Sequence, residues 1–403
     1  MRFRHPDGST VHLAYCTNVH PAEDLDGVLA QLRDHCEPVR RRLGRDRLGI
    51  GLWLAHDAAR ALDQDLAALH RLRDELDRRG LEVVTLNGFP YQGFGGRRVK
   101  HRVYRPDWTE PARLAHTTVL ARLLAALLPR DVTEGTVSTL PLAWRTRPDG
   151  TPFDDRDLER AHTALATLAR RLDAIEESTG RAVRVGLEPE PGCTVETTAG
   201  AVRALTGPGA PPPRRVGVCL DTCHLATAFE EPAAALAGLA AAGVPVVKAQ
   251  LSAALHAERP DDPAVRHALA RFVEPRFLHQ TRARTPDGTV HGVDDLDQAL
   301  GAHPEGTPAL PTSGPWRVHL HVPLHAALQP PLTATSPVLR DTLARLVGGP
   351  APLTRHLEVE TYTWHALPPE LRPRSRGRLA DGIAAELGVA RDLLTDLGLK
   401  ELP

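Results

Sequence analysis

Short hydrophobic runs alternate with longer amphipathic segments along almost the whole chain. This pattern predicts buried parallel strands separated by helices, because a strand covered on both faces is continuously apolar, whereas a helix packed on one side keeps a polar face. Eight strands are predicted, beginning near His12, Arg47, Leu81, Gly135, Arg184, Val216, Val244 and His356. A ninth run begins at Trp316, so one of the last three runs is expected to lie outside the main sheet.

Helices are predicted over 22–43, 58–79, 111–128, 155–179, 197–205 and 231–242. Repeated strand–helix units over this length predict a (β/α)8 barrel, the TIM barrel, forming one domain over 1–403. A doubly wound open sheet is the alternative, but no glycine-rich phosphate-binding turn follows the first strand. The segment 253–315 is rich in Pro, Asp, Gly and His, and is predicted to insert loops over one face of the barrel.

The composition of the chain indicates which kinds of binding partner and cellular compartment to expect. The 49 basic and 50 acidic residues give a net charge of −1, so no nucleic-acid partner is expected, although a local basic groove is left open. The five scattered cysteines favour reduced thiols over a disulfide framework. The start of the chain lacks an apolar leader, and the longest apolar stretch, AAALAGLAAAGVPVV, is short and interrupted by Pro. We therefore expect a cytoplasmic protein without membrane insertion, and homo-oligomer formation stays open.

Polar side chains recur near the C-terminal ends of the predicted strands, where a TIM barrel carries its active site. Several come as pairs two residues apart, which places both members on one face of a strand and, in a barrel, in the lumen. Burying such carboxylates is costly unless a cation or hydrogen bonds compensate them. Their mixture with imidazoles suits a divalent metal such as Mn, Mg, Zn, Co or Fe. The residues are Asn18, His20, Asn87, Glu188, Glu190, Asp221, His224, Lys248, Gln250, His319, His321, Glu358 and Glu360.

Structural alternatives exist for several of these residues. With 20 histidines in the chain, any single one is more often a structural residue than a ligand. Glu190 lies between Pro189 and Pro191 and could be a solvated loop carboxylate. Glu358 lies earlier on its strand than Glu360 and could form an ion pair with an Arg inside the barrel.

The ordered series LEPEP, LDTCH, KAQ, TLNGFP and LEVE resembles the xylose isomerase-like barrel superfamily. That superfamily includes sugar isomerases, ketose 3-epimerases, inosose-processing enzymes and endonuclease IV. More narrowly, CTNVHP, TLNGFPY, YRPDW, CLDTCHLA, FLHQTR, HLHVPLH and HLEVETYTW resemble the EboE-type metabolite traffic proteins. The resemblance covers nearly the whole chain and implies a TIM barrel that handles a small metabolite.

The resemblance also implies individual roles. Glu188 matches a glutamate that binds metal and exchanges a proton, and Asp221 matches a metal-binding aspartate. Gln250 stands where the epimerases carry a ligand histidine, so either the site tolerates an amide or His319 or His321 supplies the imidazole. The predicted catalytic residues are Glu188, Glu360, His224 and Lys248. The predicted metal ligands are Glu188, Asp221, Gln250, His321 and Glu360. The predicted substrate-binding residues are Asn18, His20, Asn87, Glu190, His319 and Glu358.

These roles predict a metal-dependent isomerase or epimerase acting on a small sugar or cyclitol-like metabolite in a biosynthesis or traffic pathway. A metal would polarise the substrate carbonyl, and the carboxylates would move the proton beside it. Two alternatives stand. A non-catalytic metabolite-binding or carrier protein could use the same barrel, and an endonuclease IV-like phosphodiesterase would use more metals and more histidine ligands.

Overall fold

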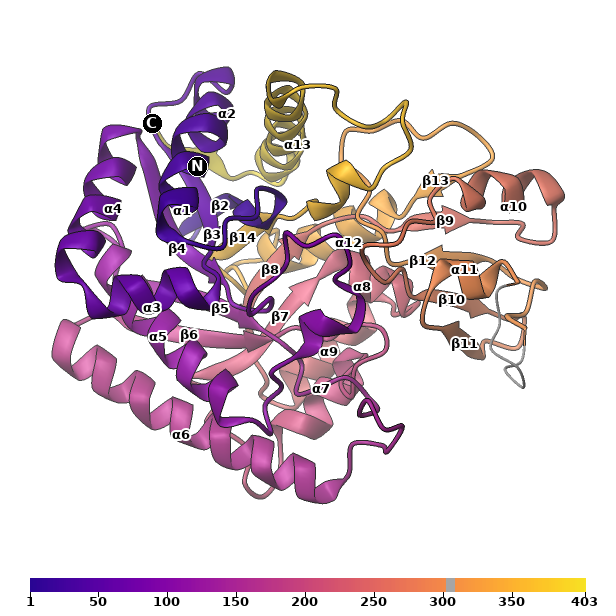
Figure 1. The fold of residues 1–403 in the computed structure, drawn as a ribbon, viewed down its shortest axis with the longest axis horizontal. Helices are drawn as coiled ribbons and strands as arrows, with labels where there is room; N and C mark the ends of the chain where they lie inside the picture. Colours follow the sequence, from indigo (N-terminus) through magenta and orange to yellow (C-terminus); the bar gives the residue numbers. More distant parts are fainter. Residues whose placement is uncertain (302–308) are drawn as a thin grey trace.

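A computed structural model describes residues 1–301 and 309–403. Within these residues, eight parallel strands close into a barrel, because the last of them, β14, pairs with the first, β2 (Figure 1). The predicted (β/α)8 barrel is therefore confirmed. The barrel strands are β2 (Thr10–Cys16), β3 (Leu48–Trp53), β4 (Leu81–Asn87), β5 (Glu134–Thr139), β6 (Ala182–Leu187), β7 (Val216–Asp221), β8 (Val246–Leu251) and β14 (His356–Val359).

Helices surround the barrel, as Figure 1 shows. The prediction over 22–43 becomes α1 (Leu25–Gln31), the π-helical turn η2 (Leu32–Cys36) and α2 (Glu37–Arg42), and the prediction over 58–79 divides at Asp65 into α3 (His56–Gln64) and α4 (Leu66–Arg78). The other predicted helices are found within a residue or two. They are α5 (Pro111–Leu127), α6 (Asp155–Thr179), α7 (Thr198–Leu205) and α9 (Pro232–Ala241). Three further helices that pack on the barrel are α8 (Thr222–Thr227), α12 (Ser336–Val347) and α13 (Arg376–Asp396).

Helix α6 illustrates why the local sequence adopts these elements. Its buried apolar residues, Leu165, Leu168 and Leu172, recur at intervals of three and four and form one face toward the barrel. The Asp154 side chain accepts a hydrogen bond from the Asp157 backbone N–H, and the Asp157 side chain accepts one from the Asp154 backbone N–H, which forms a capping box at the N-terminus. Gly180, at φ 68°, ends the helix in the left-handed conformation that glycine adopts without strain.

The region between β8 and β14 carries a second sheet, which projects to the right of the barrel in Figure 1. Its strand order is β11-β10-β12-β9-β13, with antiparallel pairing throughout. The segment 253–315 is thus richer in regular structure than the predicted loops, the sheet extends past 315 to β13, and 302–308 of that segment lie outside the described residues. The elements are β9 (Leu255–Ala257), α10 (Pro263–Ala270), β10 (Thr281–Arg284), β11 (Val290–Val293), α11 (Leu296–Ala299), β12 (Trp316–Val318) and β13 (Thr333–Ala334).

This second sheet settles which late hydrophobic run is peripheral. The run beginning at Trp316 forms β12 of the second sheet, so β8 and β14 complete the barrel. The remaining short elements are β1 (Arg2–Arg4), β15 (Lys400–Glu401) and the 3₁₀ turns η1 (Thr17–Val19), η3 (Lys100–Tyr104) and η4 (Tyr362–His365). Among the described residues, no helix combines the length and the apolar character that crossing a membrane requires.

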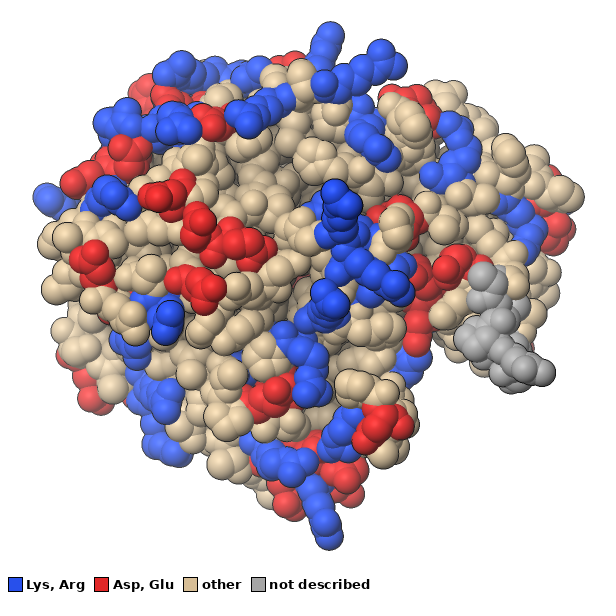
Figure 2. Space-filling view, viewed as in Figure 1, with Lys and Arg blue, Asp and Glu red and all other residues tan. Residues whose placement is uncertain are grey.

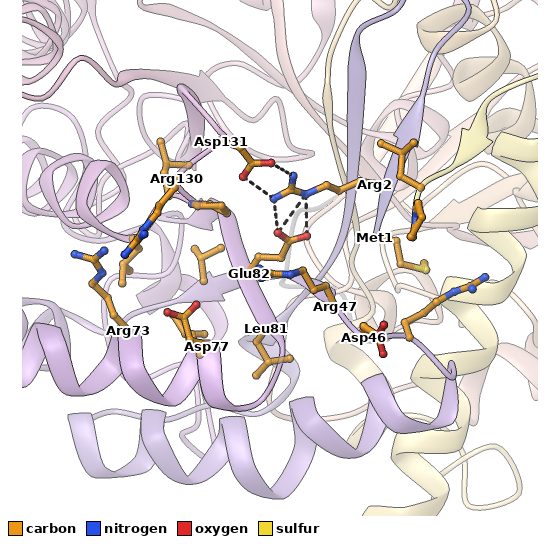
Figure 3. Close-up of a pocket in the computed structure, with 18 of the residues that line it drawn as sticks. Met1, Arg2, Asp46, Arg47, Arg73, Asp77, Leu81, Glu82, Arg130 and Asp131 are labelled. Atoms are coloured by element: carbon orange, nitrogen blue, oxygen red, sulfur yellow. Dashed lines mark hydrogen bonds and ion pairs between the residues drawn. The ribbon is translucent and has the colours of Figure 1, made fainter.

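A cavity of about 680 Å³ lies at the N-terminal ends of the barrel strands, beside Arg2 and Leu81 (Figure 3). The charges at its centre are paired, because the Arg2 guanidinium contacts both Glu82 and Asp131. The predicted polar cluster lies at the opposite ends of the strands, where TIM barrels place catalytic groups. We therefore locate the candidate site there, although its cavity is smaller.

Candidate metal centre and active site

Three carboxylates from three different strands meet at the C-terminal mouth of the barrel. Glu188 follows β6, Asp221 ends β7, and Glu360 follows β14. Each offers an oxygen within 4.8 Å of the others, and all three side chains are buried. The sequence placed these residues on one face, and the structure brings them together. Three buried carboxylates this close together form an arrangement that a divalent cation would stabilise.

The Asp221 carboxylate is oriented by its place in the fold. One oxygen, Oδ1, accepts hydrogen bonds from the backbone of Cys223 and His224, as the N-cap of α8, and from the Ser252 hydroxyl at 2.6 Å. The other oxygen, Oδ2, is buried and has no hydrogen-bond partner among the described residues. It is therefore free to bind a cation.

His321 supplies the imidazole nearest to that free oxygen. Its Nδ1 lies 2.6 Å from the backbone carbonyl of Glu360, which only accepts, so Nδ1 carries the proton and Nε2 presents a lone pair. That Nε2 is buried, lacks a partner in the described structure and lies 4.0 Å from Asp221 Oδ2. A protonated Nδ1 bound to a carbonyl is the usual arrangement of a metal-binding histidine. The residues present thus fit a divalent metal.

Gln250 lies beside the carboxylates and donates hydrogen bonds to them. Its amide nitrogen donates to Glu188 and to Glu360, and its carbonyl oxygen has no partner among the described residues. The predicted role of Gln250 as a metal ligand requires the amide oxygen, whereas this structure turns the nitrogen to the carboxylates. Asn18 and Asn87 donate to the other oxygen of Glu360, at 2.7 and 2.9 Å. These three amides hold the carboxylates, and His321 is grouped with Asp221 and His224 in a neighbouring set of ligand atoms.

A second group of residues that offer metal-ligand atoms lies beside the three carboxylates. His224 and His319 approach through their Nε2 atoms at 3.0 Å, and Glu190 completes the group. His224 Nδ1 donates to the Pro189 carbonyl. His319 Nδ1 donates to Gln280 Oε1, whose amide nitrogen is in turn committed to the Pro191 carbonyl. Both facing Nε2 atoms are therefore unprotonated in the neutral rings, and a cation or an added proton is needed between them.

Glu190 is a buried member of the site, which excludes the solvated-loop alternative. The Tyr104 hydroxyl donates to it at 2.7 Å, and the Gln280 amide lies 3.4 Å away. Tyr104, Gln280, Ser252 and Tyr362 were not among the predicted site residues. Tyr104 and Gln280 lie in the quoted motifs YRPDW and FLHQTR, and Tyr362 lies in HLEVETYTW, so their motifs were visible although their contacts were not.

Three predicted site residues lie elsewhere. Lys248 and Glu358 form an ion pair with each other, fully buried inside the barrel and one layer nearer its N-terminal end than Gln250 and Glu360. The Lys248 amine thus does not reach the carboxylate cluster in this structure. His20 stacks on His35 with ring centroids 4.1 Å apart and lines a separate cavity between α1 and η4.

Burial and mutual repulsion control the ionisation of the acidic groups. Burial, with the charges of its neighbours, raises the pKa of Glu188 and that of Glu360 well above the ordinary range. Burial raises the pKa of Glu190 to about 8, against the opposing hydrogen bond from Tyr104. Burial also opposes ionisation of Asp221, but the adjacent imidazoles and hydrogen-bond donors lower its pKa. Burial lowers the pKa of His224 to about 4, which keeps its ring neutral at pH 7.

The sequence profile of the xylose isomerase-like TIM barrel family matches residues 41–268, a little over half of the chain. The chain belongs to this family. The match includes Glu188, Asp221 and Gln250, whereas Glu360 and His321 lie beyond it. No curated protein sequence matches the chain.

Several solved structures align with this member of the xylose isomerase-like family. A D-tagatose 3-epimerase-like protein is 14% identical over 59% of this chain and 75% of its own, with a TM-score of 0.40. An IOLI protein with a bound zinc atom is 14% identical over 96% and 97%, with a TM-score of 0.44. A family 2 AP endonuclease from Brucella melitensis is 15% identical over 60% and 78%, with a TM-score of 0.37. Alignments at these values do not bear on the chemistry of the site.

Proposed function

We propose that the protein is a metal-dependent isomerase or epimerase acting on a small hydroxylated carbonyl compound. The observation that supports this most directly is the pair of buried, unpartnered ligand atoms, Asp221 Oδ2 and His321 Nε2, beside the Glu188 and Glu360 carboxylates. We propose that these four residues hold the metal. A bound divalent ion would polarise the substrate carbonyl and acidify the neighbouring C–H.

The protein's own residues supply the proton transfer in this proposal. Glu188 and Glu360 both contact the Gln250 amide and approach the site from different strands. One carboxylate removes the proton from the carbon beside the carbonyl, and a carboxylate returns a proton to the same or the adjacent carbon. Returning it to the same carbon on the opposite face gives epimerisation, and returning it to the adjacent carbon gives isomerisation.

The remaining polar residues position the substrate or the carboxylates. Asn18 and Asn87 fix the Glu360 carboxylate. His224 can donate to a substrate oxygen only when its Nε2 is protonated. The Lys248–Glu358 ion pair lies inside the barrel, one layer below Gln250 and Glu360, and supports their positions. The resemblance to EboE-type metabolite traffic proteins and to sugar and cyclitol enzymes is consistent with this proposal, and the five free, buried cysteines support a cytoplasmic location.

Metal analysis tests the proposal. The purified protein, reconstituted with Mn²⁺, Zn²⁺ or Co²⁺, should bind one ion tightly, and Asp221→Asn should remove it. Asp157→Asn is the matched control, because Asp157 is a buried aspartate whose partners, Arg147 and Arg160, lie on and near α6. Retention of the metal by Asp221→Asn, or an empty wild-type site after reconstitution, would contradict the proposed ligand set.

Solvent exchange separates an enzyme from a carrier. An isomerase or epimerase should wash deuterium from D₂O into the carbon beside the carbonyl, as observed by NMR. A metal-loaded protein that binds such compounds without exchange would instead be a non-catalytic binding or carrier protein.

A metal-dependent phosphodiesterase is a second candidate, and the facing His224 and His319 Nε2 atoms favour it because they suit a second cation. A band of basic residues also crosses the middle of the face shown in Figure 2, among scattered acidic residues. This candidate requires more than one metal per chain and hydrolysis of bis(p-nitrophenyl) phosphate or abasic-site DNA. One metal per chain and no hydrolysis would exclude it.

A further inference from the structure

The cavity above the carboxylates has two unlike walls. Its floor carries the Asn18, Asn87, Glu188, Glu190 and Glu360 side chains together with His224 and His319. Its roof is formed mainly by apolar side chains. These roof residues are Phe89, Phe94, Val99, Val103, Phe277 and Leu278.

Three polar groups near the roof have protein partners. The Trp53 indole N–H donates to the Pro90 carbonyl at 2.9 Å, and the Lys100 amine pairs with Asp295. The Tyr104 hydroxyl donates to Glu190 and accepts from Gln280. A substrate hydroxyl placed under this roof would therefore lose its water contacts and find few replacements.

Part of the roof forms a small hydrophobic cluster, whereas Phe89 and Leu278 belong to the main hydrophobic core. Trp53, Phe94, Val99 and Phe277 form a hydrophobic cluster of their own, with Tyr362 packed against it. The rings of Phe94, Phe277 and Tyr362 contact one another, with centroids 5.0 to 5.5 Å apart. The cavity holds only about 50 Å³, well below the roughly 300–1,000 Å³ of ordinary ligand sites. Substrate entry must therefore displace some of the side chains that line the cavity.

We propose that the substrate is amphiphilic: an α-hydroxycarbonyl head that faces the carboxylate floor, joined to an apolar group of about the size of a phenyl ring that packs under the roof. This inference rests on the proposed function for the chemistry of the head. It departs from a free sugar or cyclitol, whose hydroxyls surround the whole molecule and would meet the apolar roof on one side.

A matched pair of ligands tests the inference. 2-Hydroxyacetophenone and dihydroxyacetone share the same α-hydroxyketone head, and differ in carrying a phenyl ring or a hydroxymethyl group. Binding of each to the Mn²⁺-reconstituted full chain is measured by calorimetry, and deuterium uptake at the hydroxymethyl carbon is followed in D₂O. We expect 2-hydroxyacetophenone to bind at least about tenfold more tightly.

Substitutions in the roof should reduce that preference. Phe94→Ala and, separately, Phe277→Ala should each lower it to below about threefold while the metal content is unchanged, since neither residue contacts the carboxylate cluster. Leu66→Ala is the control, because Leu66 is an exposed residue at the start of α4, 71% accessible. It should keep the wild-type preference. Using two roof variants protects the test if one of them fails to fold.

The outcomes separate the inference from the proposed function. Equal or tighter binding of dihydroxyacetone, or no measurable binding of either compound, overturns the amphiphilic substrate. Deuterium uptake into dihydroxyacetone without a phenyl preference leaves the proposed function in place. A tenfold phenyl preference that the roof variants abolish, without deuterium uptake into either compound, supports the apolar subsite and contradicts the isomerase or epimerase.

Discussion

The ion pair between Lys248 and Glu358 gives a sharp prediction about which residues of the barrel interior are structural. Both side chains are fully buried, and they come from the neighbouring strands β8 and β14. The fold makes room for the pair at Gly51, where an added Cβ would lie 1.3 Å from a Glu358 oxygen. Lys248→Met would leave the Glu358 carboxylate buried without its cation.

The expected cost follows from this burial. Removing one partner of a buried ion pair typically costs about 3–5 kcal/mol, whereas replacing both partners by apolar residues of similar volume is often neutral or stabilising. We therefore expect Lys248→Met to lower the free energy of unfolding by about 3–5 kcal/mol. The double variant Lys248→Met/Glu358→Leu should return to within about 1 kcal/mol of the wild type.

Urea unfolding, followed by circular dichroism and fluorescence, measures both values, provided that the two probes coincide and the m-value is unchanged. Deuterium exchange into an α-hydroxyketone should persist in a stable double variant if the pair only supports the floor. A Lys248→Met variant that loses less than about 1 kcal/mol would refute the structural role. A stable double variant that loses exchange would instead favour the sequence-based prediction that Lys248 acts on the substrate.

Three further predictions concern single residues. Burial raises the pKa of Glu386 to about 7 from an ordinary 4.5, so the folded protein holds this proton more tightly. The shift in the Glu386 pKa stabilises the folded protein by about 3 kcal/mol. This stabilisation is complete below pH 4.5 and is lost as the pH rises through 7. Urea unfolding from pH 5 to 8 should show a correspondingly flatter stability profile for Glu386→Gln, and identical profiles would contradict the shift. Gly51→Ala should cost about 1–3 kcal/mol through its collision with Glu358, and an unchanged urea midpoint would argue against this packing. Asp154→Ala removes the N-cap of α6 and should cost about 1 kcal/mol in the same assay, while leaving the metal content unaltered.

The fold was predictable because it rests on patterns that neighbouring residues carry. Most barrel strands are almost continuously buried runs, and their helices show apolar spacing and capping residues that local sequence reveals. Apart from the run at Trp316, the second sheet was missed because its strands are only two to four residues long and part of it is exposed, as in β11. Such short strands produce no period that separates them from loops.

The candidate site was predictable only in part, for a related reason. The position of Glu188, Asp221 and Glu360 at strand ends follows from the barrel, so their proximity could be expected. Side-chain partners depend on lateral contacts that spacing does not specify. Lys248 and Gln250 share a face, yet the first pairs with Glu358 one layer down and only the second reaches the carboxylates. His20 similarly follows β2 but turns outward to stack on His35.

The imidazole of the site illustrates how the insertion and the barrel depend on each other. Gln250, on β8, uses its amide nitrogen to hold two carboxylates, while His321 reaches the same site from the segment that follows β12. The hydrogen bond from His321 Nδ1 to the Glu360 backbone ties that segment to the end of β14. Because this bond fixes the tautomer that exposes the Nε2 lone pair, the segment after β12 would supply, in the proposed metal site, an imidazole that the barrel strands lack. The insertion is therefore part of the metal site in this proposal, and its removal should abolish metal binding even if the eight-stranded barrel still folds.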